Sequence, residues 1–389
     1  MIRINTHFPG FASFLSVSDF RFRLNLISLC QCLLLWLSII LTSNAADKIT
    51  LRNLEVLRDC TVVSFDADGL VLAAERANGS KLVTWDEVES LTLESQQAEA
   101  VKLLVEVGPS LYAIQRRLLT GDDESLLAPA EKMAAIFRER RSRSACMVSL
   151  ALMWGRLAEQ RREEALEPWL RSYELLRTRA AKLGDLPGKR RPPFDPATAL
   201  SWELEPVWFD SAMAKQVFPE VDAFVATMRT PIPEGAKLYL ASLALAAGNV
   251  EQANALLDVA YEQEKSIALQ KILRVQQECV AGKTTGAAEE LQNALPKLTE
   301  ELRPVALYWL GQAGVRSTNS AQREEAFVTL LRIPALHGRR SPDLSAAALF
   351  ATFEHYREDR RLSARLRQEL LEKYPATWHG RKALNIAAP

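Results

Sequence analysis

The residue types that most often catalyse reactions or hold metals are sparse and scattered in this chain. Three of the four histidines are His337, His355 and His379. None has His-x-x-x-His or His-Glu-x-x-His spacing, which places two imidazoles on one helix face for zinc. No cysteine lies near them, and the sequence contains no Gly-x-Ser-x-Gly nucleophile motif. We therefore predict no catalytic residue, no metal site and no cofactor.

One short motif resembles the end of a phosphate-binding loop. Gly282-Lys283-Thr284 has the Gly-Lys-Thr order, but the glycine needed five residues before Gly-Lys is replaced by Gln277. The motif also requires a preceding strand, whereas the surrounding pattern here is helical. We interpret these residues as the end of a helix and an exposed turn.

Composition indicates a globular protein of more than one domain. The chain has 389 residues, of which 48% are apolar, and that length fits about two or three domains. Lys plus Arg and Asp plus Glu number 48 each. A protein that coats nucleic acid would be strongly basic, so nucleic acid is not an expected partner. Arginine outnumbers lysine, as in proteins from GC-rich bacterial genomes.

The first 45 residues have the pattern of an export signal. Arg3, Arg21 and Arg23 precede an uncharged stretch at 24–41, and small residues follow at Ser43 and Ala45. This pattern predicts a signal peptide over 1–45 that is cleaved after Ala45. The alternative is a retained signal anchor, because the uncharged stretch is nearly long enough to span a bilayer. The chain is expected in the periplasm or at the cell surface, or anchored in the inner membrane and facing outward.

Cysteine usage gives no disulfide framework for the exported part. Cys60, Cys146 and Cys279 are odd in number and widely spaced, unlike the cysteines of small disulfide-stabilised domains. We expect each to be a small buried residue.

Residues 46–94 predict a small β domain. Short β-branched runs alternate with turn residues, and Asn78-Gly79-Ser80 is a strong hairpin signal because asparagine and glycine tolerate positive φ. Four or five short strands, the first at Cys60, can form only a small bent barrel. The runs Asp-x-Asp-Gly-Leu-Val-Leu and Trp-Asp-Glu-Val-Glu-Ser-Leu resemble those of SH3-like and Sm-like barrels. That resemblance implies binding of peptides, RNA or cell-wall material through loops. We interpret Phe65 and Trp85 as core residues.

Residues 95–186 predict helices with apolar residues at helical spacing. The expected segments are 99–107, 109–119, 124–137, 144–158 and 163–183, of which the last two form a hairpin. The basic run from Arg138 to Arg143 is interpreted as a solvated helix face, with Glu139 and Arg143 paired four residues apart.

Residues 187–233 form a connector rich in prolines and aromatic residues, for which we expect short helices. An enzyme site is conceivable here if a deep pocket brings together Trp202, Trp208, Glu203 and Asp210.

Residues 234–389 contain a 34-residue period. Gly248 and Gly282 are 34 residues apart. The same spacing separates three further pairs, which are Ala253 and Ala287, Leu257 and Leu291, and Ala260 and Ala294. This period predicts a repeated pair of helices in which glycine ends the first helix and small alanines let the second approach its neighbours.

The repeated segment resembles the tetratricopeptide repeat. Leu240-Ala241 and Leu310-Gly311 stand where that family has its Leu-Gly pair, and a further copy spans 345–374. The resemblance implies a mainly α solenoid of helical hairpins, with a concave first-helix groove that holds extended peptides or helices and has no catalytic residues.

We therefore expect a non-enzymatic exported scaffold that binds protein partners of the cell envelope. Membrane contact is expected only through an uncleaved N-terminal segment. The candidate partner-binding residues on the first-helix face are Tyr239, Ser242, Lys271, Gln312 and Arg316. The alternative is a cell-wall or polysaccharide-binding protein that uses the small β domain, with the helices as a spacer.

Overall fold

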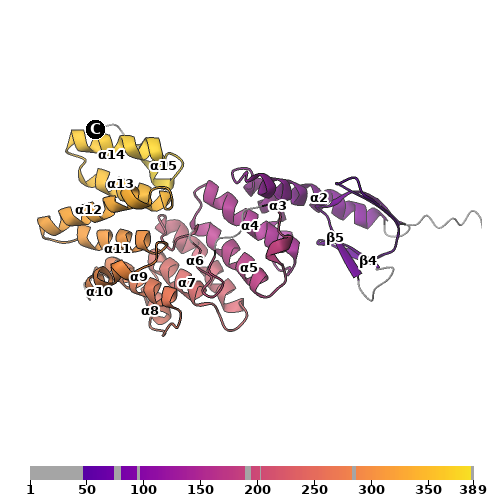
Figure 1. The fold of residues 1–389 in the computed structure, drawn as a ribbon, viewed down its shortest axis with the longest axis horizontal. Coiled ribbons are helices and arrows are strands. Elements are labelled where there is room, and N and C mark those ends of the chain that lie inside the picture. Colours follow the sequence, from indigo (N-terminus) through magenta and orange to yellow (C-terminus); the bar gives the residue numbers. More distant parts are fainter. Residues whose placement is uncertain are drawn as a thin grey trace, which may run out of the picture.

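The protein is mainly helical, with a small β unit at its N-terminal end. The computed structural model describes residues 47–73, 80–93, 97–188, 194–201, 203–282 and 286–386. Within these ranges lie fourteen α-helices, α2 to α15, preceded by six strands. The β unit and the C-terminal helices occupy opposite ends of an elongated molecule (Figure 1). This confirms the predicted fold class. The export segment, the Asn78-Gly79 turn and Lys283-Thr284 lie outside the described residues.

The β unit consists of two three-stranded antiparallel sheets with orders β2-β1-β6 and β3-β4-β5. The strands are β1 (Asp47–Leu51), β2 (Val56–Cys60), β3 (Val62–Asp66), β4 (Gly69–Ala73), β5 (Ser80–Thr84) and β6 (Val88–Thr92). The prediction of four or five strands missed β1 and β2. β2 reads Val-Leu-Arg-Asp-Cys, and its two adjacent charges hide the alternation that reveals a half-buried strand.

Trp85 is the centre of the β unit's core. Its side chain is fully buried together with Ile49, Leu70 and Val88. Its Nε1 donates a hydrogen bond to the carbonyl oxygen of Asp66 at 2.7 Å, which satisfies the only polar atom of the ring. Phe65 is half-buried against the same core. The interpretation of Phe65 and Trp85 as core residues is confirmed.

Ion pairs fasten the β unit to the first helices. These helices are α2 (Gln97–Thr120), α3 (Leu127–Phe137) and α4 (Arg143–Ala158). Arg140 pairs with Asp66 at 2.7 Å and with Asp68 at 2.9 Å. Arg143 pairs at 3.0 Å with Asp86, whose side chain is fully buried. The interpretation of this basic run as a solvated helix face was wrong. Most of it is the loop between α3 and α4, and two of its arginines, Arg140 and Arg143, bind aspartates of the β unit.

Replacing Arg143 with alanine should lower the free energy of unfolding by about 2 kcal/mol, because the buried Asp86 carboxylate loses its cation. Urea unfolding measures this loss. The matched control is Arg138→Ala, which breaks an ion pair with Glu220 in which both side chains are about half exposed. Such pairs contribute about 0–1 kcal/mol. Equal losses in the two variants would contradict the importance of the Arg143–Asp86 pair.

One helical expectation needs adjustment and another is met. The segments 99–107 and 109–119 are one helix, α2, with Pro109 inside it. The apolar face of α2 continues past the proline through Val107, Leu111 and Ile114, all buried, so packing outweighs the lost backbone hydrogen bond. The expected hairpin of the last two segments is present, formed by α4 and α5 (Leu166–Arg177).

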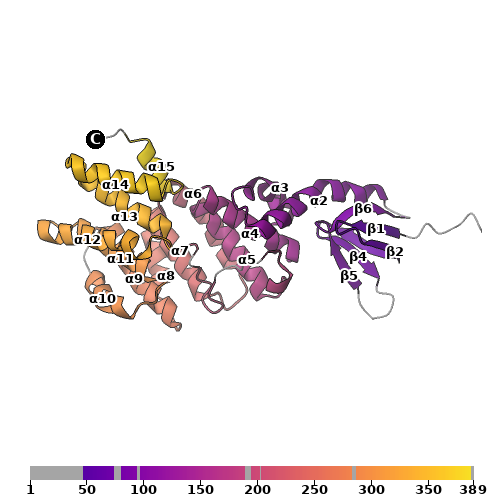
Figure 2. The ribbon, with the colours of Figure 1, turned by 45° about the horizontal axis from the view of Figure 1, so that its top comes forward.

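The C-terminal half is a stack of helical pairs (Figure 2). After α6 (Ser211–Thr227), a longer helix than expected in the connector, come α7 (Glu234–Ala247), α8 (Val250–Leu257), α9 (Glu264–Ala281), α10 (Ala287–Ala294), α11 (Arg303–Val315), α12 (Ser320–His337), α13 (Pro342–His355), α14 (Arg360–Lys373) and α15 (Trp378–Leu384). Gly248 and Gly282 end α7 and α9 with positive φ, at 84° and 65°, as the 34-residue period predicts.

The second helices are shorter than the period suggests. α8 ends at Leu257 and α10 at Ala294, so each has only 8 residues. Ala260 therefore lies beyond its helix and is exposed. Its predicted role as a small residue in helix packing was wrong. α12, by comparison, has 18 residues.

Candidate functional site

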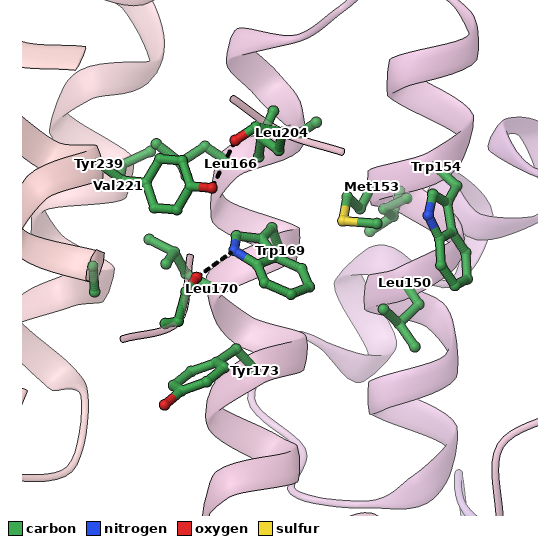
Figure 3. Packing of buried hydrophobic residues seen from close by; sticks show 14 of the residues in the cluster. Leu150, Met153, Trp154, Leu166, Trp169, Leu170, Tyr173, Leu204, Val221 and Tyr239 are labelled. Carbon is green, nitrogen blue, oxygen red and sulfur yellow. Dashed lines mark hydrogen bonds between the residues drawn. The ribbon is translucent and has the colours of Figure 1, made fainter. Parts of the chain in front are cut away.

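Two of the predicted partner-binding residues are buried inside the protein. Tyr239 and Ser242 lie on α7 and have no exposed surface. The Tyr239 hydroxyl donates to the carbonyl oxygen of Leu204 at 2.6 Å (Figure 3). Ser242 Oγ donates to the carbonyl oxygen of Pro206 at 2.7 Å. Their placement on an open groove is corrected, since both bind a segment of the same chain.

That segment, which we call the inner segment, comprises residues 199–201 and 203–209. It has no regular secondary structure, yet most of its side chains are buried, including Leu204, Val207 and Trp208. Irregular backbone is buried at low cost only where other groups satisfy its carbonyl oxygens. Trp169 Nε1 donates to Ala199 at 3.2 Å (Figure 3).

Arg162 supplies further donors to the inner segment from the turn between α4 and α5. Its Nη2 donates to the carbonyl oxygen of Glu205 at 2.7 Å, and its Nε donates to that of Val207 at 3.0 Å. Arg162 is itself only 5% exposed. The first-helix face of α7 is therefore covered by a segment of the same chain.

The residues considered for an enzyme site have structural partners instead. Glu203 accepts a hydrogen bond from Trp154 Nε1 at 2.6 Å. Asp210 caps α6 by accepting from the amides of Ala212 and Met213, each at 3.0 Å. Trp208 is buried, and its Nε1 donates to Ser242 Oγ at 3.1 Å. Trp202 lies outside the described residues.

A small cavity does lie beside the inner segment, lined by Glu205, Leu200 and Tyr239 among others. Its volume is about 30 Å³, which is room for about one water molecule. Ligand sites for small molecules have about 300–1,000 Å³, so this cavity does not favour the enzyme interpretation.

The C-terminal helix α15 returns to the end of α4. The amide of Trp378 donates to Gln160 Oε1 at 2.9 Å, and Arg381 Nη1 donates to the carbonyl oxygen of Glu159 at 3.3 Å. The buried His379 ring contacts Phe209 of the inner segment, with ring centroids 4.7 Å apart. α15 thus joins the last helical pair to the first helical region.

Burial of His379 should make the protein sensitive to acid. Burial lowers the pKa of His379 from 6.5 to about 3. Because the folded pKa lies below the unfolded one, the resulting stability is complete above pH 6.5 and is lost as pH falls toward 3. The loss should reach about 3 kcal/mol near pH 4. Urea unfolding at about pH 7 and about pH 4 measures this loss of unfolding free energy. It should be present in the unmodified chain and in the control His355→Gln, whose ring is partly exposed. In His379→Gln the loss between the two pH values should be smaller by about 3 kcal/mol, and a loss equal to that of the unmodified chain would refute the assignment.

An open groove runs across α9, α10, α11 and α12. Its volume is about 610 Å³. Two of its lining residues, Ala288 and Gln292, come from the 8-residue α10. Its lining includes Cys279, Ala288, Gln292, Leu310, Ala313, Gly314, Arg316, Gln322, Glu325, Ala326, Thr329 and Arg332.

The groove combines a wall of small residues with exposed cations. Gly314 of α11 lies so close to α12 that an added Cβ would stand 2.7 Å from the Cβ of Ala326. Arg316 and Arg332 are exposed on the rim. Within the described residues neither guanidinium has an ion-pair partner. The groove therefore offers apolar surface and two cations, next to the carboxylates of Glu278 and Glu325.

Of the five predicted residues, only Arg316 lines this groove. Lys271 pairs with Glu290 at 2.8 Å and lines a separate hollow between α9 and α10. Gln312 is half-buried on α11 and lines neither hollow. Arg332 and the shortness of α10 were not predicted. The signal for the latter is Pro296, which follows Ala294 closely and stops the helix.

The cysteines are not placed for reactivity. Cys146 and Cys279 are buried and free, and burial raises the pKa of their thiols to about 12 and about 11. The thiolates needed for nucleophilic chemistry are therefore disfavoured. Cys60 is half-buried, and its Sγ donates to the carbonyl oxygen of Asp47 at 3.4 Å.

Two further findings concern metals and membranes. Across the ranges that the structure describes, no three His, Cys, Asp or Glu side chains lie close enough to hold a metal ion. No helix in that part of the chain is both long and apolar enough to cross a bilayer.

Comparisons of the chain with family models, with curated proteins and with solved structures found no match.

Proposed function

We propose that the protein is a non-enzymatic scaffold or adaptor that binds a protein partner in the groove across α9–α12. The observation that carries this proposal is the open groove of about 610 Å³ with Arg316 and Arg332 on its rim. Arginine is enriched in protein interfaces and binds carboxylates in a bidentate manner.

Other features support the same function. The stack of helical pairs with Gly248 and Gly282 at equivalent helix ends is consistent with a tetratricopeptide-like solenoid, an architecture suited to extended binding surfaces. The acids Glu203 and Asp210 are engaged in structural hydrogen bonds. The N-terminal export pattern leads us to propose a partner in the bacterial cell envelope.

Affinity capture from native envelope extract, read by mass spectrometry, tests this proposal. The full chain is compared with Arg316→Glu/Arg332→Glu, which reverses both rim charges. The matched control is Arg360→Glu/Arg361→Glu, the same charge change at exposed positions of α14. We expect the groove variant to lose at least about tenfold of one captured protein, corresponding to about 1.4 kcal/mol of binding free energy. The control should retain that protein. Equal capture by both variants would reject the groove.

A second candidate is binding of cell-wall or polysaccharide material by the β unit. It is favoured by exposed apolar side chains on the second sheet. Leu82 of β5 is 45% exposed and stands opposite Val71 of β4, and Val63 of β3 is 63% exposed. The β unit shares ion pairs and one core with the helices, so substitution is a cleaner test than deletion. If Val63→Lys/Leu82→Lys abolishes retention on isolated cell wall while the groove variant binds normally, the second candidate holds.

A further inference from the structure

Three segments distant in sequence meet at a buried cluster of charges. Arg162 lies at the end of the α4 region, Glu205 in the inner segment and Asp343 in the first turn of α13. Arg162 Nη1 lies 3.1 Å from Asp343 Oδ2, and Arg162 Nη2 lies 3.7 Å from Glu205 Oε2. The side chains of Arg162 and Glu205 are 5% and 8% exposed. Arg162 and Asp343 are 181 residues apart along the chain.

Arg162 faces both carboxylates but lies closer to that of Asp343 than to that of Glu205. Two of its donors already bind the carbonyl oxygens of Glu205 and Val207, and a third binds Asp343. The Glu205 carboxyl group is left with a long contact to Arg162, while Asp343 repels its negative form. Burial is the main cause that raises the pKa of Glu205 to about 7, with the Asp343 charge adding to it.

The other charged and titratable groups around Glu205 do not resolve this competition. Arg340, just before α13, is paired at 2.9 Å with Glu301, which lines the adjacent cavity. Lys265 of α9 is paired at 2.8 Å with Asp195 across the same cavity. The Tyr239 hydroxyl of α7 donates to Leu204. Glu163 accepts from the amides of Phe209 and Asp210.

We propose that Glu205 is a proton-controlled latch for the C-terminal helices. When Glu205 is protonated, Arg162 holds Asp343, and with it α13, against the inner segment. When Glu205 loses its proton, its carboxylate competes with Asp343 for the same guanidinium group, and the hold on α13 weakens.

The latch should act on α15 as well as on α13. These two helices pack against each other, and Trp378 and Arg381 of α15 donate hydrogen bonds to the end of α4. Loosening of α13 therefore exposes the face between α15 and the inner segment. The latch consists of Arg162, Glu205 and Asp343 and is independent of the groove across α9–α12.

Hydrogen–deuterium exchange of the full chain at about pH 6 and about pH 8, corrected for intrinsic exchange rates, tests the latch. Protection of peptides from α13 and α15 should fall about tenfold or more between these pH values, while peptides from β4 and β6 should keep theirs. Glu205→Gln should remove the fall. Glu203→Gln, the same substitution two residues earlier, should behave as the unmodified chain.

Asp343→Asn gives a second, independent outcome. It removes the partner through which Arg162 holds α13, so protection of α13 should be low at both pH values and should not depend on pH. This result is informative even if Glu205→Gln fails to fold. The proposal would be overturned if protection of α13 in the unmodified chain did not depend on pH. It would also be overturned if the pH-dependent fall in protection persisted in Glu205→Gln or in Asp343→Asn.

Discussion

Replacing Arg162 with methionine should lower the free energy of unfolding by about 4 kcal/mol. The guanidinium group is nearly fully buried and binds two carbonyl oxygens of the inner segment as well as Asp343. Methionine fills a similar volume but leaves these acceptors without a donor, and the loss of one partner from a buried charge pair costs about 3–5 kcal/mol. Urea unfolding followed by circular dichroism measures this loss.

Arg161→Met is the matched control, one residue earlier. Arg161 is about one-third exposed and pairs with Glu164 at 2.6 Å and Glu131 at 2.9 Å. Because surface ion pairs contribute about 0–1 kcal/mol, this variant should lose no more than that. If Arg162→Met lost as little as Arg161→Met, the inner segment would not depend on Arg162.

Gly235→Ala should destabilise the protein by about 3 kcal/mol. Gly235 lies in the first turn of α7, and an added Cβ would overlap the carbonyl oxygen of Thr198. Since the obstacle is backbone, no side-chain rotation relieves it, and overpacking of this kind costs about 1–3 kcal/mol or more. The chain just before the inner segment would have to move away from α7. Thermal unfolding should show the change as a lower midpoint temperature.

Gly184→Ala is the control for this substitution. An added Cβ at Gly184 would meet no atom within 4 Å, and its φ is not positive, so this variant should unfold within about 0.5 kcal/mol of the unmodified chain. A neutral Gly235→Ala would mean that the segment at Thr198 does not pack on α7 as described.

Local signals in the sequence were sufficient for many elements. Residue type and spacing predict that Gly248 and Gly282 end helices and that Trp85 is buried. Glycine at a helix end and an aromatic residue within a strand pattern can each be recognised from neighbouring residues. The helical pairs follow from the 34-residue period. Positions in these elements could be predicted because they depend on near neighbours in the chain.

The filled first-helix face could not be predicted in this way. A polar residue on a first helix, such as Tyr239 or Ser242, fits an open groove and an internally satisfied segment equally well. The choice depends on Arg162 and on where the inner segment crosses α7, which are long-range contacts. Arginine is mostly found on protein surfaces, so nothing in the local sequence indicates that Arg162 is buried. The groove across α9–α12 is lined by residues of four helices, so it depends on how those helices pack, which no local pattern in the sequence reveals.

Site-specific photo-crosslinking in native envelope extract tests the central claim, that a protein partner occupies this groove, most directly. A photoreactive residue replaces Gln292, an exposed residue of α10 that lines the groove. In the control it replaces Gln368, an exposed residue of α14. We expect a discrete crosslinked protein at position 292 and none at position 368. A third probe replaces Leu82 of the β unit. If position 292 gave no crosslink and position 82 gave one, the claim would be contradicted and the β unit would be the binding surface.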